Sequence, residues 1–137
     1  MVMLSGLFFT GNERKLLKLA LNGRITLVLA ETVIEETLEK IEEIFAGSAS
    51  VEESRKLLKA MISNSIIIRI EEAKRFFASA KESIRDESDA PLLAACIHTK
   101  PYALVTGDKD FFNLKTKVDF KIMTARQFLE EFQVYSQ

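Results

Sequence analysis

Short, almost wholly apolar segments alternate along this 137-residue chain with segments of helical periodicity. The clearest apolar segment is Ile25 to Ala30, and its composition is typical of a strand that helices cover on both faces. Ser65 to Ile70 is interpreted as a second buried strand. Strands that alternate with helices are joined by right-handed crossovers, which make the strands parallel. The sequence therefore predicts an α/β fold with a central parallel sheet and helices on both faces, in a single domain over residues 1–137.

The same periodicity assigns the rest of the chain. Helices are expected at 12–21, 32–45, from Ser50 through 62, at 71–84, 90–99 and after Thr124, with strands at 102–106 and 120–123 and a short helical turn at 108–114. Three of the helix starts carry a hydroxyl residue followed three positions later by Glu or Gln, the spacing of a capping box. These pairs are Thr32 with Glu35, Ser50 with Glu53, and Thr124 with Gln127.

Composition limits the class of protein. With 47% apolar and 28% charged residues the chain should fold by itself, and a net charge of -1 argues against a broad basic surface for duplex nucleic acid. Its apolar runs are far shorter than the roughly twenty residues that span a bilayer, so no membrane association is expected. The single cysteine, Cys96, predicts a reducing, cytoplasmic setting. The chain has one His and one Cys, too few for a structural zinc site, so any metal would be bound by oxygen ligands.

Two groups of carboxylates stand where a parallel sheet brings them together. Asp86 and Asp89 open the helix at 90–99, and Asp108 and Asp110 follow the strand at 102–106. In open parallel sheets, ligands bind at the carboxyl ends of the strands, where these segments converge. Carboxylate oxygens are the ligands that Mg2+ and Mn2+ prefer, so the pattern indicates a site for one of these ions.

Each carboxylate also has a plainer interpretation. Asp89, or Ser88 beside it, can simply cap the helix that follows, and Asp108 can shape a turn after Gly107. A further acid can come from the helix at 32–45, where Glu35 and Glu36 flank the apolar stripe on opposite sides. The capping box occupies Glu35, which leaves Glu36 free to point elsewhere.

These residues resemble a known family. The run Asp86-x-x-Asp89-Ala-Pro and the run Thr106-Gly-Asp108-Lys-Asp110-Phe are similar to the carboxy-terminal signature of PIN-domain proteins, especially the PilT N-terminus-like group related to VapC-type toxins. The similarity extends to residues 11–20, to the strand at 25–30 and to residues 33–38. The resemblance therefore covers nearly the whole chain.

The resemblance implies a three-layer α/β/α fold and a metal-dependent endoribonuclease, the toxin of a toxin-antitoxin pair, that acts on single-stranded or structured RNA with Mg2+ or Mn2+. Its partners would be RNA, an antitoxin protein and a second copy of the chain in a homodimer. The residues that match the family's acidic metal positions are Glu36, Asp89 and Asp108, with Asp110 as a fourth ligand or outer-sphere participant and Thr106 as a nearby hydroxyl on the substrate side. Apart from the resemblance, Lys109 and Arg85 lie close enough in the sequence to hold flanking phosphates.

The amino-terminal end departs from the family pattern. Family members usually begin with an apolar strand that ends in Asp, followed by Thr-Asn and an apolar helix that residues 2–9 resemble. Met1 then aligns with that Asn, so we expect the first strand and its Asp to be absent. This departure supports an alternative, a degenerate PIN-like module that binds protein or RNA without catalysis. A phosphatase would need a nucleophilic Asp after its first strand, and none is visible.

Overall fold

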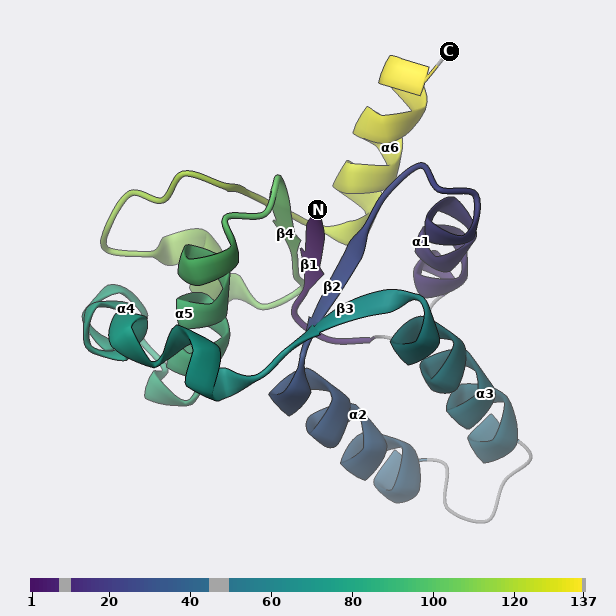
Figure 1. Ribbon diagram of the computed structural model, residues 1–137, viewed down its shortest axis with the longest axis horizontal. Coiled ribbons are helices and arrows are strands. Elements are labelled where there is room, and N and C mark those ends of the chain that lie inside the picture. The colour runs from purple at the N-terminus through teal and green to yellow at the C-terminus, as the bar shows by residue number, and fades with distance from the viewer. Residues whose placement is uncertain (8–10, 45–49, 137) are drawn as a thin grey trace.

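Five parallel strands form a central sheet in the order β3-β2-β1-β4-β5 (Figure 1). The structure is a computed structural model that describes residues 1–7, 11–44 and 50–136. The strands are β1 (Val2–Leu4), β2 (Leu27–Ala30), β3 (Ser65–Ile68), β4 (Ala103–Val105) and β5 (Lys121–Met123). The predicted α/β fold with a central parallel sheet is confirmed.

The central strand is the one that sequence analysis expected to be absent. β1 pairs with β2 on one side and β4 on the other, with Met3 opposite Val28 and Leu104. All three β1 residues are buried. The alignment of Met1 with the family's Asn was therefore wrong, because Val2 to Leu4 supply the strand and not the start of a helix. The residue at the strand's carboxyl end is Ser5.

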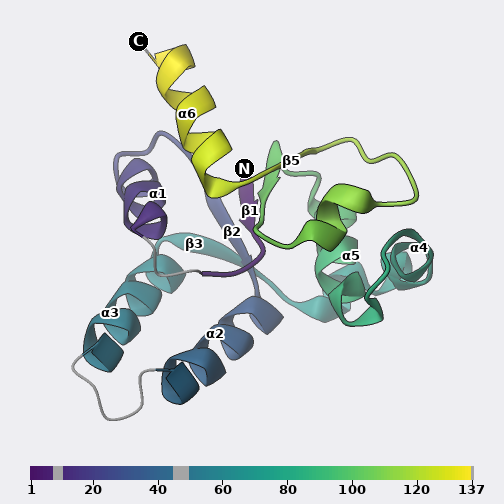
Figure 2. The same ribbon diagram turned by 180° about the vertical axis from the view of Figure 1, so that it is seen from behind.

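Helices cover both faces of the sheet, as Figures 1 and 2 show. One layer holds α1 (Asn12–Leu21), α2 (Glu31–Ile44), α3 (Ser50–Ser63) and α6 (Ala125–Ser136), and α1 packs against both α3 and α6. The other layer holds η1 (Ile70–Phe76), α4 (Phe77–Ser83), η2 (Glu87–Asp89) and α5 (Ala90–Thr99), and η3 (Lys109–Asn113) connects β4 to β5. The three-layer α/β/α arrangement is thus confirmed, and none of the described helices is long and apolar enough to cross a membrane.

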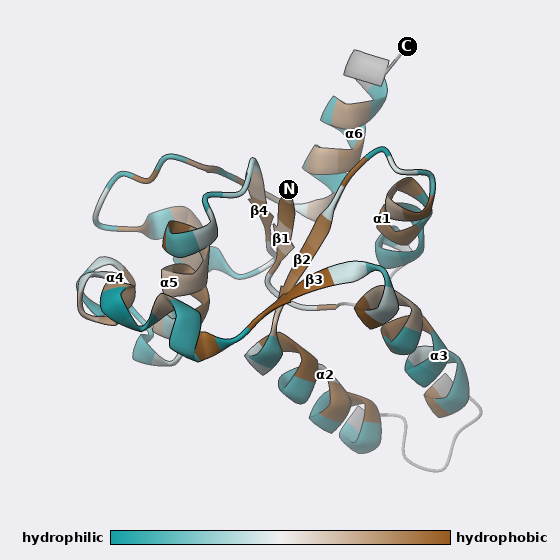
Figure 3. Ribbon diagram, viewed as in Figure 1, coloured by the Kyte–Doolittle hydropathy of each residue, from teal (hydrophilic) through white to brown (hydrophobic). Residues whose placement is uncertain are grey.

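The core lies between these layers and is built on the middle strands, which Figure 3 shows as hydrophobic. Leu27, Val28 and Leu29 of β2 are fully buried, as is Leu104 of β4. The prediction that the strand at Ser65 is also buried was wrong. β3 lies at the edge of the sheet, and there Ile66 and Ile67, whose side chains point to opposite faces, are 45% and 37% exposed.

Local departures concern the ends and the type of helices. The helix expected at 71–84 is a 3-10 helix, η1, followed by α4. α2 begins at Glu31, directly after β2, so Thr32 lies inside its first turn and not before it. The capping box of Thr124 and Gln127 is confirmed by reciprocal hydrogen bonds of 2.9 and 3.1 Å. Phe45 and the region before Ser50 lie outside the described residues.

The position of β1 predicts the cost of truncating its middle residue. Met3→Ala should lower the free energy of unfolding by about 2–5 kcal/mol, because Met3 is fully buried and a cavity would remain. Met123→Ala on the edge strand β5 is the matched control, and its half-buried side chain should give a clearly smaller loss. Urea denaturation measures both variants. Equal losses would contradict a central β1.

Candidate functional site

A cavity of about 230 Å³ opens at the carboxyl edge of the sheet. Four segments line it. Residues 5–7 follow β1, and residues of the first three turns of α2, up to Lys40, follow β2. The other lining residues are Ser88, Asp89, Pro91 and Leu92 at the start of α5, and Asp108 and Phe111 after β4. Parallel pairing brings these segments to one edge, because the chain leaves each of the paired strands there. The cavity is therefore where the predicted acidic groups can meet.

Asp86 and Asp89 are held by the turn that leads into α5. Asp86 caps η2, since its Oδ1 accepts hydrogen bonds from the backbone N and the hydroxyl of Ser88 at 3.0 and 2.8 Å. Asp89 precedes the first residue of α5, and Pro91 stands in the first turn, where its missing N–H leaves nothing unsatisfied. The Asp89 side chain makes no capping hydrogen bond. The plainer interpretation of Asp89 as a helix cap is therefore not what the structure shows.

Asp108 is fixed by hydrogen bonds to residues two positions away in its own loop. Its Oδ1 accepts a hydrogen bond from the Asp110 backbone N at 2.9 Å, which caps η3. Its own backbone N donates to the Thr106 hydroxyl at 3.0 Å. Thr106 is only 1% exposed, so its hydroxyl holds the Asp108 loop from the interior of the protein. The capping role considered for Asp108 is present, and it leaves the carboxylate at the cavity.

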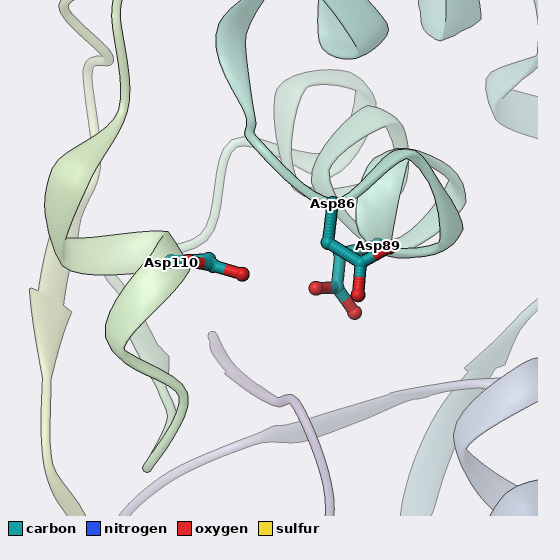
Figure 4. A group of neighbouring side chains, drawn as sticks. All are labelled: Asp86, Asp89 and Asp110. Carbon is teal, nitrogen blue, oxygen red and sulfur yellow. The ribbon is translucent and has the colours of Figure 1, made fainter.

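Three carboxylates converge in front of α5. Ligand oxygens of Asp86, Asp89 and Asp110 all lie within 4.8 Å of one another, and Figure 4 shows the Asp110 carboxylate pointing toward the other two. Arg85 braces Asp110 through hydrogen bonds of 3.1 and 3.4 Å to its two oxygens. Arg85 is thereby committed to an ion pair beside the carboxylates.

The acidic groups leave Asp89 in an unfavourable environment. Partial burial, followed by the charge of the neighbouring Asp108 and then that of Asp86, raises the pKa of Asp89 to about 6. Its Oδ2 is buried and, among the residues that the structure describes, has no hydrogen-bond partner. A buried oxygen without a donor is costly unless something else satisfies it. A divalent cation would satisfy it, because the donors around it are oxygens of the kind that Mg2+ and Mn2+ bind.

The structure places the predicted site residues in three groups. Glu36, Asp89 and Asp108 line the same cavity, and Glu35 does not. Asp110 lies beside Asp89 in the acidic group of Figure 4. Lys109 is exposed in η3 and is not part of the cavity lining, and Arg85 is engaged with Asp110 as described.

Ser5 and Lys40 line the cavity and were not among the predicted site residues. Ser5 was missed because β1 was not recognised, although the apolar triplet before it is the strand's signal. Lys40 lines the cavity one turn after Glu36 on α2. The spacing of four residues between them places both on one face of the helix, so Lys40 could have been found once Glu36 was chosen. The site thus pairs carboxylates with a lysine and a serine hydroxyl.

Comparisons with known proteins agree with this architecture. The family model described as PIN domain matches residues 1–110. A search of the curated proteins finds no match. A chain in the crystal structure of VapBC2 from Rickettsia felis, bound to a DNA fragment from their promoter, has a similar fold, with a TM-score of 0.58 at 16% identity over 89% of this chain and 97% of that one. The match to the family model covers most of the sequence. The chain therefore belongs to the PIN domain family.

The raised pKa of Asp89 predicts a pH-dependent gain from removing its charge. The folded-state pKa, about 6, lies above the ordinary value of 3.8, so ionisation of Asp89 favours the unfolded state as pH rises between these values. Asp89→Asn should therefore be more stable than the unchanged chain above pH 6, with the gain shrinking toward pH 4. Thermal unfolding without divalent ions measures it. A gain that is the same at pH 4 and pH 7.5 would contradict this cause.

Proposed function

We propose that this chain is a metal-dependent endoribonuclease of the PIN type. The observation that carries the proposal is the carboxylate of Asp89, which lies within 4.8 Å of those of Asp86 and Asp110 and next to Asp108, and whose buried Oδ2 has no hydrogen-bond partner in the described part of the chain. If Asp89 had only a structural role, an apolar or neutral side chain at its position would be more stable than a partly buried carboxylate among other carboxylates. Instead, carboxylates from two separate segments surround an oxygen that lacks a donor, which is the arrangement expected of a cation site.

Glu36, Asp89 and Asp108 would hold Mg2+ or Mn2+, with Asp110 as a fourth ligand. When bound, such an ion lowers the pKa of a coordinated water and offsets negative charge on a phosphodiester. The chain's own residues set the geometry for this. The Asp110 backbone N–H fixes the Asp108 carboxylate, and Arg85 fixes that of Asp110. These fixed positions keep the acids in place before any ligand arrives.

Cationic side chains near the cavity can position the substrate. Lys40 lines the cavity on the side of Glu36, where its ammonium can contact a phosphate oxygen. Lys109, exposed in η3 next to Asp108, can hold a flanking phosphate. Arg85 can do so only by sharing its guanidinium with Asp110. RNA recognition at this site therefore starts from Lys40 and Lys109.

Removal of one metal-ligand charge should abolish the proposed activity. Asp89→Asn and Asp108→Asn should each reduce Mn2+-stimulated cleavage of single-stranded RNA by on the order of 100-fold or more, since each loses a carboxylate that stabilises the cation. Asp119→Asn, which changes an exposed carboxylate outside the cavity, is the matched control. EDTA should stop cleavage by the unchanged chain. Undiminished cleavage by either site variant would refute the assignment.

Ser5 favours a second candidate function, a non-catalytic PIN-like module. It stands at the carboxyl end of β1, where the family usually has Asp, and it lines the cavity. A hydroxyl offers a neutral oxygen in place of a carboxylate, so the site would hold a divalent cation less tightly. The module would then bind RNA or a protein without cleaving it. Calorimetry distinguishes the two functions, because this alternative predicts no Mn2+ affinity above background.

Restoring the carboxylate should strengthen the cation site. Ser5→Asp is expected to increase Mn2+ affinity by about tenfold or more, equivalent to about 1.4 kcal/mol for one added charged ligand. Ser5→Asn, which has the same shape without the charge, should change the affinity much less. Isothermal titration with MnCl2 compares the three proteins. An unchanged affinity in Ser5→Asp would exclude the end of β1 from the site.

Four further features complete the proposal: an antitoxin partner, a homodimer, a cytoplasmic location and a single domain. An antitoxin protein is proposed as a partner, supported by the fold shared with the VapBC2 structure, and a homodimer as the assembled form. The buried free thiol of Cys96 is compatible with a cytoplasmic location, and residues 1–137 would act as one domain. Co-purification with the product of an adjacent small reading frame tests the antitoxin. Sedimentation tests the dimer, and a monomer at every concentration would exclude it.

A further inference from the structure

A basic groove is lined by residues of α1 and α6 and of the segment after α1. The two helices lie on the layer opposite α5 (Figure 1). The groove has a volume of about 710 Å³. Four cationic residues line it, Lys15, Lys18, Arg24 and Arg126, against a single carboxylate, that of Glu130. The chain as a whole carries a net charge of -1. Positive charge is therefore concentrated on this surface and is not a general property of the protein.

Most of that positive charge is not neutralised by the protein. Glu130 forms an ion pair with Arg126 at 3.0 Å within α6. Among the described residues, no ion pair involves Lys15, Lys18 or Arg24. The nearby Glu131 is committed to Lys121 and to the hydroxyl of Tyr102, both at 2.7 Å. Three cations of the groove thus remain available to an anionic ligand.

The groove also has an aromatic end. The Arg24 guanidinium lies over the ring of Phe132, with its Cζ 5.0 Å from the ring centroid. Arg24 and Phe132 also line an adjoining hollow of about 430 Å³, together with Tyr102 and Phe128. Tyr102 is 50% exposed, so part of its surface is accessible from solvent. Phe128 is buried against Phe132, and Lys121 Nζ lies 5.0 Å from the centroid of the Tyr102 ring, so the flat groups within reach of a base are the Arg24 guanidinium and the exposed part of Tyr102. Single-stranded nucleic acid binds flat groups next to a row of cations, because phosphates meet the charges and bases stack on the flat groups.

We propose that this groove binds single-stranded RNA, with phosphates on Lys15, Lys18 and Arg24 and a base in the aromatic hollow. An acidic protein segment would match the positive charge of the groove, but its carboxylates would not stack on the flat groups beside the cations. Amide side chains of Asn12, Asn22 and Gln133 line the groove and can hydrogen-bond to base edges. The bound strand is a cleavage substrate only if the proposed function holds, and the binding itself does not depend on that.

The groove is close enough to the acidic cavity to hold the same strand. Leu7 lines the cavity and Asn12 lines the groove. Four residues lie between them in the sequence, so the chain limits the distance between their Cα atoms to about 18 Å. From Asn12 the groove follows α1 toward Asn22 at the opposite edge of the sheet. An RNA cleaved at the acidic cavity can therefore extend along α1.

The test measures binding apart from cleavage. Asp89→Asn protein in EDTA is titrated with a labelled oligouridylate of about 16 nucleotides, the longest span typical of one such binding site. The groove variant carries Lys15→Gln, Lys18→Gln and Arg24→Gln. The control variant carries Lys56→Gln, Lys59→Gln and Arg75→Gln, since Lys56 and Lys59 are exposed at the same spacing on α3 and Arg75 lies over Phe76 at 4.8 Å. Both variants have the same net charge.

The groove variant should bind on the order of 100-fold more weakly at about 0.1 M salt. Three phosphate contacts on a single strand give a slope near -2 for the logarithm of the affinity against the logarithm of the salt concentration, and the variant loses that contribution. The control variant should bind within a few-fold of its parent. Equal losses in both variants, or no loss in the groove variant, would overturn the proposal. So would tighter binding of a polyglutamate peptide than of RNA, because the surface would then fit an acidic protein.

Failure of the proposed function has a different signature. If the unchanged chain binds the oligouridylate through the groove but does not cleave it with Mn2+, the nuclease assignment fails and the groove assignment stands. If it cleaves RNA and the groove variant loses no affinity, only the groove assignment fails. Circular dichroism of both triple variants verifies that each is folded, and all six substituted side chains are exposed.

Discussion

The pairing of β1 with β2 on one side and β4 on the other determines where the candidate site lies. Hydrogen bonding continues one residue beyond the strands, since the Ser5 N–H donates to the Val105 carbonyl at 3.0 Å and the Thr106 N–H donates to that of Met123 at 2.9 Å. Ser5 and Thr106 are thereby fixed at one edge of the sheet. The loops that leave this edge carry Asp108 and the start of α2, so a shift in register would move the site apart.

The acids are tolerated because they sit on well-packed elements. α5, which follows Asp89, is buried along most of its length, with Ala90, Leu93 and Cys96 fully inaccessible. Repulsion between Asp89 and Asp108 opposes folding, and burial of α5 offsets it. This arrangement keeps an unsatisfied carboxylate in place at the expense of stability, which is usual for sites that bind a ligand.

Most of the architecture could be predicted from the sequence, and the failures have physical causes. The bounds of α5 and the capping box at Thr124 follow from local chemistry, and both are as expected. β1 was not predicted because its three apolar residues are too few to show the periodicity of a strand or of a helix. The apolar residues after Gly6 also make the segment look longer than the strand is. Glu36 was preferred to Glu35 because a capping box at Thr32 was expected to occupy Glu35. α2 begins one residue earlier, at Glu31, so this reason was wrong. The position of Glu36 in the cavity follows instead from where the helix starts.

The serine at the end of β1 changes how charge is balanced at the site. A carboxylate there would add repulsion to Asp89, whose pKa is already raised, and would bind a cation more strongly. Ser5 brings neither effect, so Asp89 meets less repulsion, and a cation at the proposed site would be held by fewer charges. Under the proposed function, a phosphodiester would depend more on cations that the protein itself supplies, of which Lys40 lines the cavity and Arg24 lies at the far end of the basic groove.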